Sequence, residues 1–148
     1  MIMDWKKEAI CDLENYRDNK NSLENLRERI QALKEKADGL KAIAADRVPV
    51  KGGASKMEDR LIDNIAERER LKHTYLATKR LVGLVERGLS VLNEEERTVL
   101  STLYIEPKSK GAVDLLCGII GCEKATVYRI RDKALYHFTK SLYGMLDY

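Results

Sequence analysis

The stretch that decides the fold is LCGIIGCEKATVYRI, residues Leu116–Ile130. Leu116 and Ile120 lie one helical turn apart, and Cys117 is a small residue at a point where a second helix must pass close by. Gly121 follows at the position of a turn, where a positive φ costs least. Beyond this glycine, apolar residues return at the spacing of a second helix: Cys122, Val127 and Ile130. The pattern predicts two short helices joined by a tight turn.

Two helices joined in this way form a helix-turn-helix, in which the second helix lies in the DNA major groove. The predicted second helix begins near Glu123 and faces inward with Val127 and Ile130. Its other face carries the side chains that we expect to contact DNA: Glu123, Lys124, Ala125, Tyr128, Arg129, Asp132 and Lys133. The sequence therefore predicts a protein that binds double-stranded DNA.

Three of these side chains suit contacts with base edges. The Arg129 guanidinium can bind guanine O6 and N7 together, a contact worth about 1–3 kcal/mol of discrimination. Glu123 can accept a hydrogen bond from the cytosine N4 amine, and Tyr128 can pack on a thymine methyl group or bind a phosphate. Asp132 has an alternative role, because it can pair with Arg129 or Arg131 and reduce the positive charge of the surface.

The lysines suit contacts with phosphates. Residues 107–148 contain seven Lys or Arg and four Asp or Glu, whereas residues 1–46 contain nine and ten. The basic excess therefore lies beside the helix-turn-helix pattern, where salt-sensitive phosphate contacts are expected. The expected phosphate anchors are Lys108, Lys110, Lys124 and Lys133.

The N-terminal part of the chain predicts two long amphipathic helices. Apolar residues in the first follow a heptad pattern: Leu23, Leu26, Ile30, Leu33, Ala37, Leu40 and Ala44. Upstream, an apolar stripe continues at Trp5, Ala9, Leu13 and Tyr16, but Asn19 or Lys20 interrupts the register, and a stutter or local unwinding is expected there. The second helix begins near Ser55 and repeats the spacing at Leu71, Tyr75, Thr78, Val82, Val85, Leu89 and Leu92. The helices pair as an antiparallel hairpin within one chain or as a coiled coil between two chains, and the sequence leaves both open.

A loop and a capping motif divide the chain. Residues 46–56, DRVPVKGGASK, contain Pro49 and two glycines and are expected to form the loop between the long helices. Asn93 and Glu96 have the spacing of a capping box, so a new helix begins there, and Pro107 ends it. We therefore expect an all-α protein with a helical hairpin or coiled coil over residues 1–90. A three- to four-helix DNA-binding domain is expected over residues 91–148.

Other classes of function are not favoured. No P-loop, paired His and carboxylate, or nucleophile beside a histidine occurs in the sequence, so an enzyme is not expected. The three cysteines, Cys11, Cys117 and Cys122, lack the spacing of a zinc site with either histidine, so no metal or cofactor is predicted. No long apolar run resembles a signal peptide or a membrane span, which favours a cytoplasmic protein without a membrane partner.

The C-terminal segment resembles region 4 of sigma-70-type transcription factors. The similarity begins at Leu92 and Arg97, in LNEEERTVLSTLYIE, and extends to TVYRIRDKAL. The residues that match the motif of that region are Leu92, Arg97, Gly121, Thr126, Val127, Arg129, Ile130, Lys133, Ala134 and Leu135. This resemblance implies a promoter-binding fold. The sequence lacks a segment that resembles the promoter-melting region of sigma factors, which favours a regulator over a complete sigma factor.

The whole chain is similar to small phage and prophage proteins of Gram-positive bacteria, the late transcription regulators of the ArpU and RinA type. This resemblance implies a regulator that activates late packaging and structural genes in a bacterial host. It also implies RNA polymerase as a further partner, and the heptad helices suggest a homodimer. Two alternatives stay open: a DNA-packaging component similar to a small terminase subunit, and a polymerase-binding protein that does not bind DNA.

Overall fold

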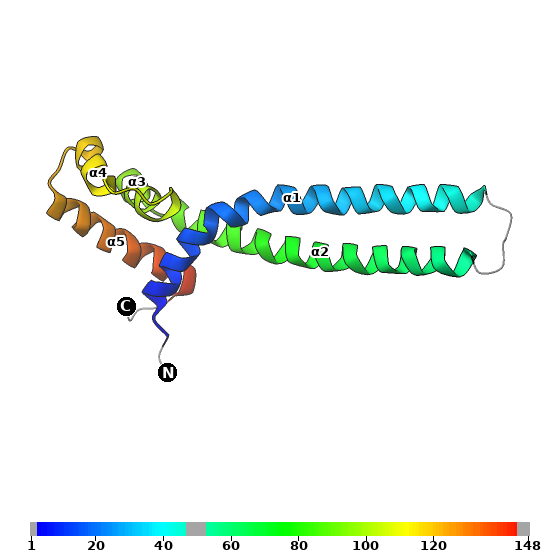
Figure 1. The fold of residues 1–148 in the computed structure, drawn as a ribbon. Coiled ribbons are helices and arrows are strands. Elements are labelled where there is room, and N and C mark those ends of the chain that lie inside the picture. Colours follow the sequence, from blue (N-terminus) through cyan, green and yellow to red (C-terminus); the bar gives the residue numbers. More distant parts are fainter. Residues whose placement is uncertain (1–2, 47–52, 145–148) are drawn as a thin grey trace. The chain divides into compact units, whose positions relative to one another are not determined.

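The computed structural model describes residues 3–46 and 53–144, and all of its regular elements are helical (Figure 1). No strand occurs among these residues, so the predicted all-α class is confirmed for this part of the chain. The helices are α1 (Trp5–Ala45), α2 (Gly53–Ser90), α3 (Glu94–Leu100), the π-helical segment η1 (Ser101–Ile105), α4 (Ala112–Ile120) and α5 (Lys124–Tyr143).

The chain divides into two compact units, and both long helices contribute to each. Unit 1 consists of Met1–Lys20 and Arg80–Tyr148, and unit 2 consists of Asn21–Lys79. This grouping differs from the predicted division after residue 90. The difference arises because Ala9 and Leu13, near the start of α1, lie in the same hydrophobic cluster as residues of α5.

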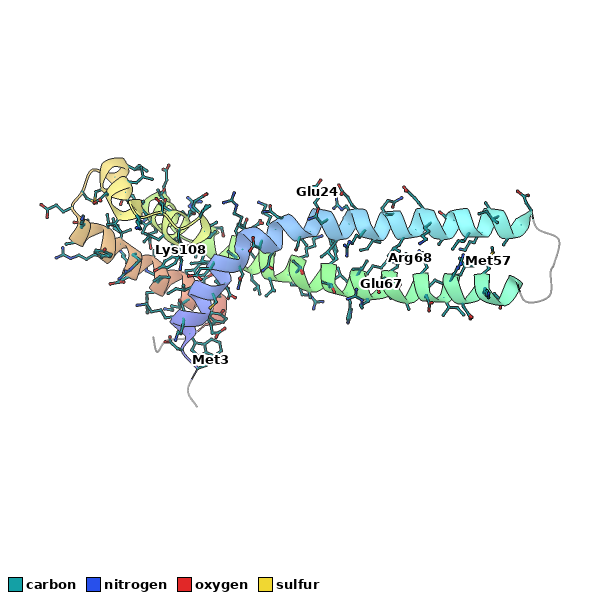
Figure 2. The ribbon with its side chains drawn as sticks, in the orientation of Figure 1. Met3, Glu24, Met57, Glu67, Arg68 and Lys108 are labelled. Carbon is teal, nitrogen blue, oxygen red and sulfur yellow. The ribbon has the colours of Figure 1, made fainter. Side chains whose placement is uncertain are left out.

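Unit 2 is an antiparallel pair formed by residues 21–45 of α1 and 53–79 of α2 (Figure 1). Ala37 and Leu71 are buried along the predicted apolar stripe. The side-chain amide of Asn64 donates a 2.8 Å hydrogen bond to the backbone carbonyl of Leu33, and Arg68 Nε donates to Asn64 Oδ1 over 2.8 Å. Arg68 is labelled on α2 in Figure 2. These helices therefore pair within one chain, and a buried asparagine bonded across the pair favours one register.

The ends of the long helices differ from the prediction in one place. α2 begins at Gly53 and not near Ser55, so the predicted loop at 46–56 is too long at its C-terminal end. A glycine costs least at the edge of a helix, and no proline follows Pro49 here to prevent the helix from starting. Pro49 itself lies outside the described residues. α1 continues through Asn19 and Lys20 without a break.

The core of unit 1 joins the start of α1 and the end of α2 to α3 and α5. Its fully buried residues include Leu13, Leu100, Leu135 and Phe138, and Val85 and Leu92 belong to the same cluster. At the edge, Tyr143 donates a hydrogen bond to the Asp12 carboxylate, and its ring centroid lies 4.8 Å from that of Trp5. Burial, together with this carboxylate, raises the pKa of Tyr143 well above its usual range. The first turns of α1 are thus an integral part of unit 1.

Gly88 allows α2 to approach α5 closely. A Cβ atom at this position would lie 2.7 Å from Phe138 Cε2 and 2.7 Å from Leu142 Cδ1. We expect Gly88→Ala to lower the free energy of unfolding, because overpacking costs about 1–3 kcal/mol, more than the roughly 1 kcal/mol that alanine adds in a helix. Urea denaturation followed by circular dichroism measures the change.

Gly118→Ala is the matched control. Gly118 is exposed inside α4, and a Cβ atom there would meet no other atom within 4 Å, so only the helix propensity changes. This variant is expected to unfold at a higher urea concentration than the native chain. If both substitutions shifted the midpoint upward, the close approach at Gly88 would be refuted.

Two reciprocal hydrogen bonds between Asn93 and Glu96 cap the N-terminus of α3. The Asn93 side chain accepts from the Glu96 backbone N–H at 2.8 Å, and the Glu96 carboxylate accepts from the Asn93 backbone N–H at 3.5 Å. The predicted capping box is therefore confirmed. Glu96 is buried, and its Oε2 atom lies 3.0 Å from Nδ1 of His137 on α5. This contact ties the start of α3 to α5, the helix that carries most of the predicted site.

Candidate nucleic-acid interface

The segment from α4 to α5 consists of two helices joined by a turn at Gly121. α4 spans Ala112–Ile120, and Gly121 adopts the left-handed conformation with φ of 75°. The backbone N–H groups of Gly121 and Cys122 both donate to the Cys117 carbonyl, over 2.9 and 3.2 Å. A positive φ with this pair of bonds is the usual way in which a glycine ends a helix.

A small second core holds α4 against α5. Its fully buried residues are Val99 of α3, Leu116 of α4 and Val127 of α5. Partly buried side chains complete it: Leu103, Val113, Cys117, Ile120, Cys122 and Ile130. Burial raises the pKa of the Cys122 thiol, as expected for a cysteine that acts as a small apolar residue. The apolar positions of the opening motif therefore meet in one cluster.

The nine predicted site residues are exposed. Six lie on the first half of α5: Lys124, Ala125, Tyr128, Arg129, Asp132 and Lys133. Glu123 is the residue before α5, with extended backbone and no capping hydrogen bond from its side chain. Lys108 and Lys110 lie in the segment before α4. Each of these side chains is accessible to a ligand.

Arg131, which was not among the predicted site residues, neutralises Asp132. Its Nε and Nη2 atoms donate to Asp132 Oδ1 over 3.1 and 2.9 Å, and its guanidinium lies 4.9 Å from the centre of the Tyr128 ring. The sequence left Arg129 and Arg131 open as ion-pair partners of Asp132, and in the structure the partner is Arg131. Among the described residues, Arg129 and Lys133 have no ion-pair partner, so their charges stay available.

A hollow of about 380 Å³ lies near the start of α5, and three lysines line it. It is lined by two residues of η1, the turn before α4, the first residues of α4, which include the acidic Asp114, and the first two turns of α5. The predicted residues on its wall are Lys108, Lys110, Lys124 and Tyr128. The remaining five do not line it: Glu123, Ala125, Arg129, Asp132 and Lys133. The predicted site is thus a cationic hollow beside a separate exposed face of α5.

Two lysines of the hollow have exposed carboxylate partners. Lys124 Nζ lies 3.3 Å from Asp114 Oδ1, and Lys108 Nζ lies 3.9 Å from Glu14 Oε1. Exposed ion pairs contribute about 0–1 kcal/mol, so a phosphate can replace these partners at little cost. Glu14 comes from α1, and its contact with Lys108 was not predicted, because the expected domain boundary separates that helix from the lysine.

Two further observations concern other kinds of site. Within residues 3–46 and 53–144, no three His, Cys, Asp or Glu side chains gather in a group that could hold a metal ion. No helix in the described part of the chain is long and apolar enough to cross a membrane.

The fold and the surface define an all-helical protein that presents a cationic hollow next to an exposed helix face. A family model described as "Protein of unknown function (DUF1492)" matches residues 40–139, so the chain belongs to this family. The matched region includes the second half of unit 2, the capping box and all nine predicted site residues. No curated protein and no solved structure gives a significant match to the chain.

Proposed function

We propose that this protein is a sequence-specific DNA-binding transcription regulator, in which α4 and α5 act as a helix-turn-helix. The observation that carries the proposal is the surface of α5. Its first half is buried on one side through Val127, while the other side exposes Arg129 and Lys133 without ion-pair partners among the described residues. A rigid helix with unneutralised basic side chains suits the DNA major groove.

The two parts of the surface then have different roles. Arg129 on the exposed face reads guanine, and Glu123 contacts a neighbouring base, whereas Tyr128 at the wall of the hollow packs on a thymine methyl group or binds a phosphate. The lysines of the hollow bind backbone phosphates and fix the orientation of α5 without reading sequence. Arg131 stacks on Tyr128 and holds Asp132, which keeps that carboxylate away from Arg129.

The resemblance to sigma region 4 supports a role at promoters. It extends over about residues 90–140 and includes Arg129 and Lys133 of the exposed face. In this proposal the protein acts in the cytoplasm of a bacterial host and activates late packaging or structural genes of a phage or prophage. RNA polymerase is then a second partner, beside double-stranded DNA.

The salt dependence of DNA binding tests the role of the hollow. Duplexes selected by the full chain from a random library serve as probes, with a scrambled duplex beside them. Changing Lys108, Lys110 and Lys124 together to alanine is expected to weaken binding to both duplexes alike. Because each phosphate contact contributes about 0.9 to the slope of log K against log salt, the slope should fall by about 2–3.

The control for this test changes three exposed lysines of α1 in unit 2 to alanine: Lys34, Lys36 and Lys41. This variant loses the same net charge and should keep the native salt slope. An equal loss of slope in both variants would mean that net charge alone drives binding. The assignment of the hollow to phosphate would then be wrong.

One observation favours a second function, a protein-binding role without DNA. Leu115 and Ile119 lie one turn apart on α4, and they are 58% and 60% exposed. Apolar side chains exposed together mark surfaces that bind other proteins. If the selection yields no enriched duplex and the tagged chain co-purifies with RNA polymerase, this second function is the correct one.

A further inference from the structure

The outer surface of α2 in unit 2 carries apolar side chains that nothing in the described part of the chain covers. Ile62, Ile65 and Leu76 are 62%, 49% and 52% exposed. They lie on the side of α2 opposite Asn64 and Leu71, which are buried. Two exposed alanines, Ala66 and Ala77, share this face. In α1 of the same unit, the only large apolar side chain with comparable exposure among the described residues is Ile43.

The charges along this part of α2 are strongly asymmetric. Residues 58–69 contain five Asp or Glu and two Lys or Arg, a net charge of −3. Residues 70–79 contain three Lys or Arg and no acidic residue, a net charge of +3. On the outer surface, exposed Glu58 and Glu69 belong to the acidic half, and exposed Arg70 and Lys72 belong to the basic half. Lys72 Nζ lies 3.5 Å from Glu69 Oε1, and Arg70 pairs with Glu67. Exposed ion pairs within a helix contribute little to stability, so carboxylates and cations of a second copy can replace these partners at little cost. A helix with this pattern complements a second copy of itself only when the two run antiparallel.

We propose that this face binds a second copy of the chain, with the two α2 helices antiparallel about a two-fold axis near residues 69–70. Ile62 and Ile65 of one copy then lie against residues 73–77 of the other, and each acidic half faces a basic half. A parallel pair would place like charges opposite each other, which is unfavourable. A two-fold axis makes the contact self-complementary, as in most homodimers.

The shape of the face agrees with this arrangement. A shallow hollow of about 590 Å³ lies on it, lined by Glu69, Arg70, His73, Thr74 and Ala77. Four of these residues, at 70, 73, 74 and 77, have the spacing of the hole that receives one side chain in knobs-into-holes packing. With the two-fold axis near residues 69–70, Ile62 of one copy lies at the level of residue 77 of the other, and the small Ala77 at the edge of this hollow permits a close approach there.

The proposed dimer differs from a coiled coil built on the heptad stripe. That stripe is already used inside the chain, where Asn64 of α2 donates to the Leu33 carbonyl of α1. The outer face of α2 is therefore a separate surface. The dimer goes beyond the proposed DNA binding and does not depend on it, so either can fail without the other.

Sedimentation equilibrium of the full chain tests the dimer. The apparent mass should rise with concentration from the monomer value of 16.9 kDa toward twice that value. Ile65→Lys places a cation opposite the basic half of the second copy and should weaken the dimer at least tenfold. Ile43→Lys, a change at a residue of equal 49% exposure on α1, should leave it unchanged. Urea midpoints check that both variants stay folded.

Cysteine cross-linking in a Cys11→Ser background tests the orientation. Chains with Ile62→Cys and chains with Ala77→Cys should form a disulfide-linked dimer when mixed and oxidised, and neither should do so alone. Cross-linking of each chain with itself would indicate a parallel pair and overturn the proposal. A monomeric mass from micromolar to millimolar concentration would overturn it too, as would equal weakening by Ile65→Lys and Ile43→Lys.

Discussion

A chain that lacks residues 1–20 is expected to lose the cooperative unfolding of unit 1. Ala9 and Leu13 are fully buried in the cluster that also contains Leu100, Leu135 and Phe138. Removing a single buried leucine typically costs about 2–5 kcal/mol, and whole domains are stable by about 5–15 kcal/mol. Loss of the entire segment should therefore leave α5 without a stable core. Amide dispersion in NMR spectra and urea titration by circular dichroism measure this.

A pair of single substitutions separates the loss of packing from the loss of chain length. Leu13→Ala should lower the free energy of unfolding by about 2–5 kcal/mol, whereas Cys11→Ala, at an exposed position two residues earlier, should have little effect. If the truncated chain kept the native dispersion and unfolding midpoint, the predicted division after residue 90 would be correct. The grouping of α1 with the C-terminal helices would then be wrong.

Arg129→Ala is expected to remove most of the sequence preference of DNA binding while the fold stays intact. The side chain is exposed and has no ion-pair partner in the described residues, so its loss leaves no buried group unsatisfied. One bidentate arginine–guanine contact contributes about 1–3 kcal/mol, so the affinity ratio between selected and scrambled duplexes should fall about 5- to 150-fold. Competition binding at fixed salt measures the ratio.

Lys140→Ala is the matched control for Arg129. Lys140 is an exposed cation on the same helix, near its C-terminal end and three turns beyond Arg129. Its removal changes the net charge by the same amount and should leave the affinity ratio unaltered. If both variants lost the same preference, a general charge effect would explain the result and not a base contact at Arg129.

Local signals made much of the C-terminal fold predictable. The helix before Gly121 follows from the apolar spacing of Leu116 and Ile120, and the left-handed turn follows from Gly121, a residue type that adopts positive φ at little cost. The capping box follows from the identity and spacing of Asn93 and Glu96. In each case the interacting residues lie within a few positions of each other, so the sequence contains the whole interaction.

The partners of the first turns of α1 were not predictable in this way. Periodicity shows that Ala9 and Leu13 lie on an apolar stripe, but it does not show which surface the stripe packs against. The apolar register is interrupted near Asn19 and Lys20, between this stripe and the hairpin, and the structure packs the stripe with Phe138, which is distant in the sequence. For the same reason the contact between Glu14 and Lys108 was missed.

The charge balance on α5 was predictable only in part. The sequence left Asp132 free to pair with Arg129 or Arg131, and both choices are sterically open on a helix surface. The structure pairs it with Arg131, whose guanidinium also stacks on Tyr128 one turn earlier. The Tyr128 ring three residues before Arg131 was the available signal for this arrangement. A cation three residues beyond an aromatic side chain lies on the same helix face and can stack on the ring.

Protection of guanine N7 in a selected duplex against dimethyl sulfate tests the central claim most directly, because N7 is reached only from the major groove. If α5 reads the major groove through Arg129, the full chain should protect at least one guanine N7, and Arg129→Ala should abolish this protection at concentrations that still saturate the duplex. The claim would be contradicted if every guanine N7 stayed fully reactive while the native chain saturated the duplex.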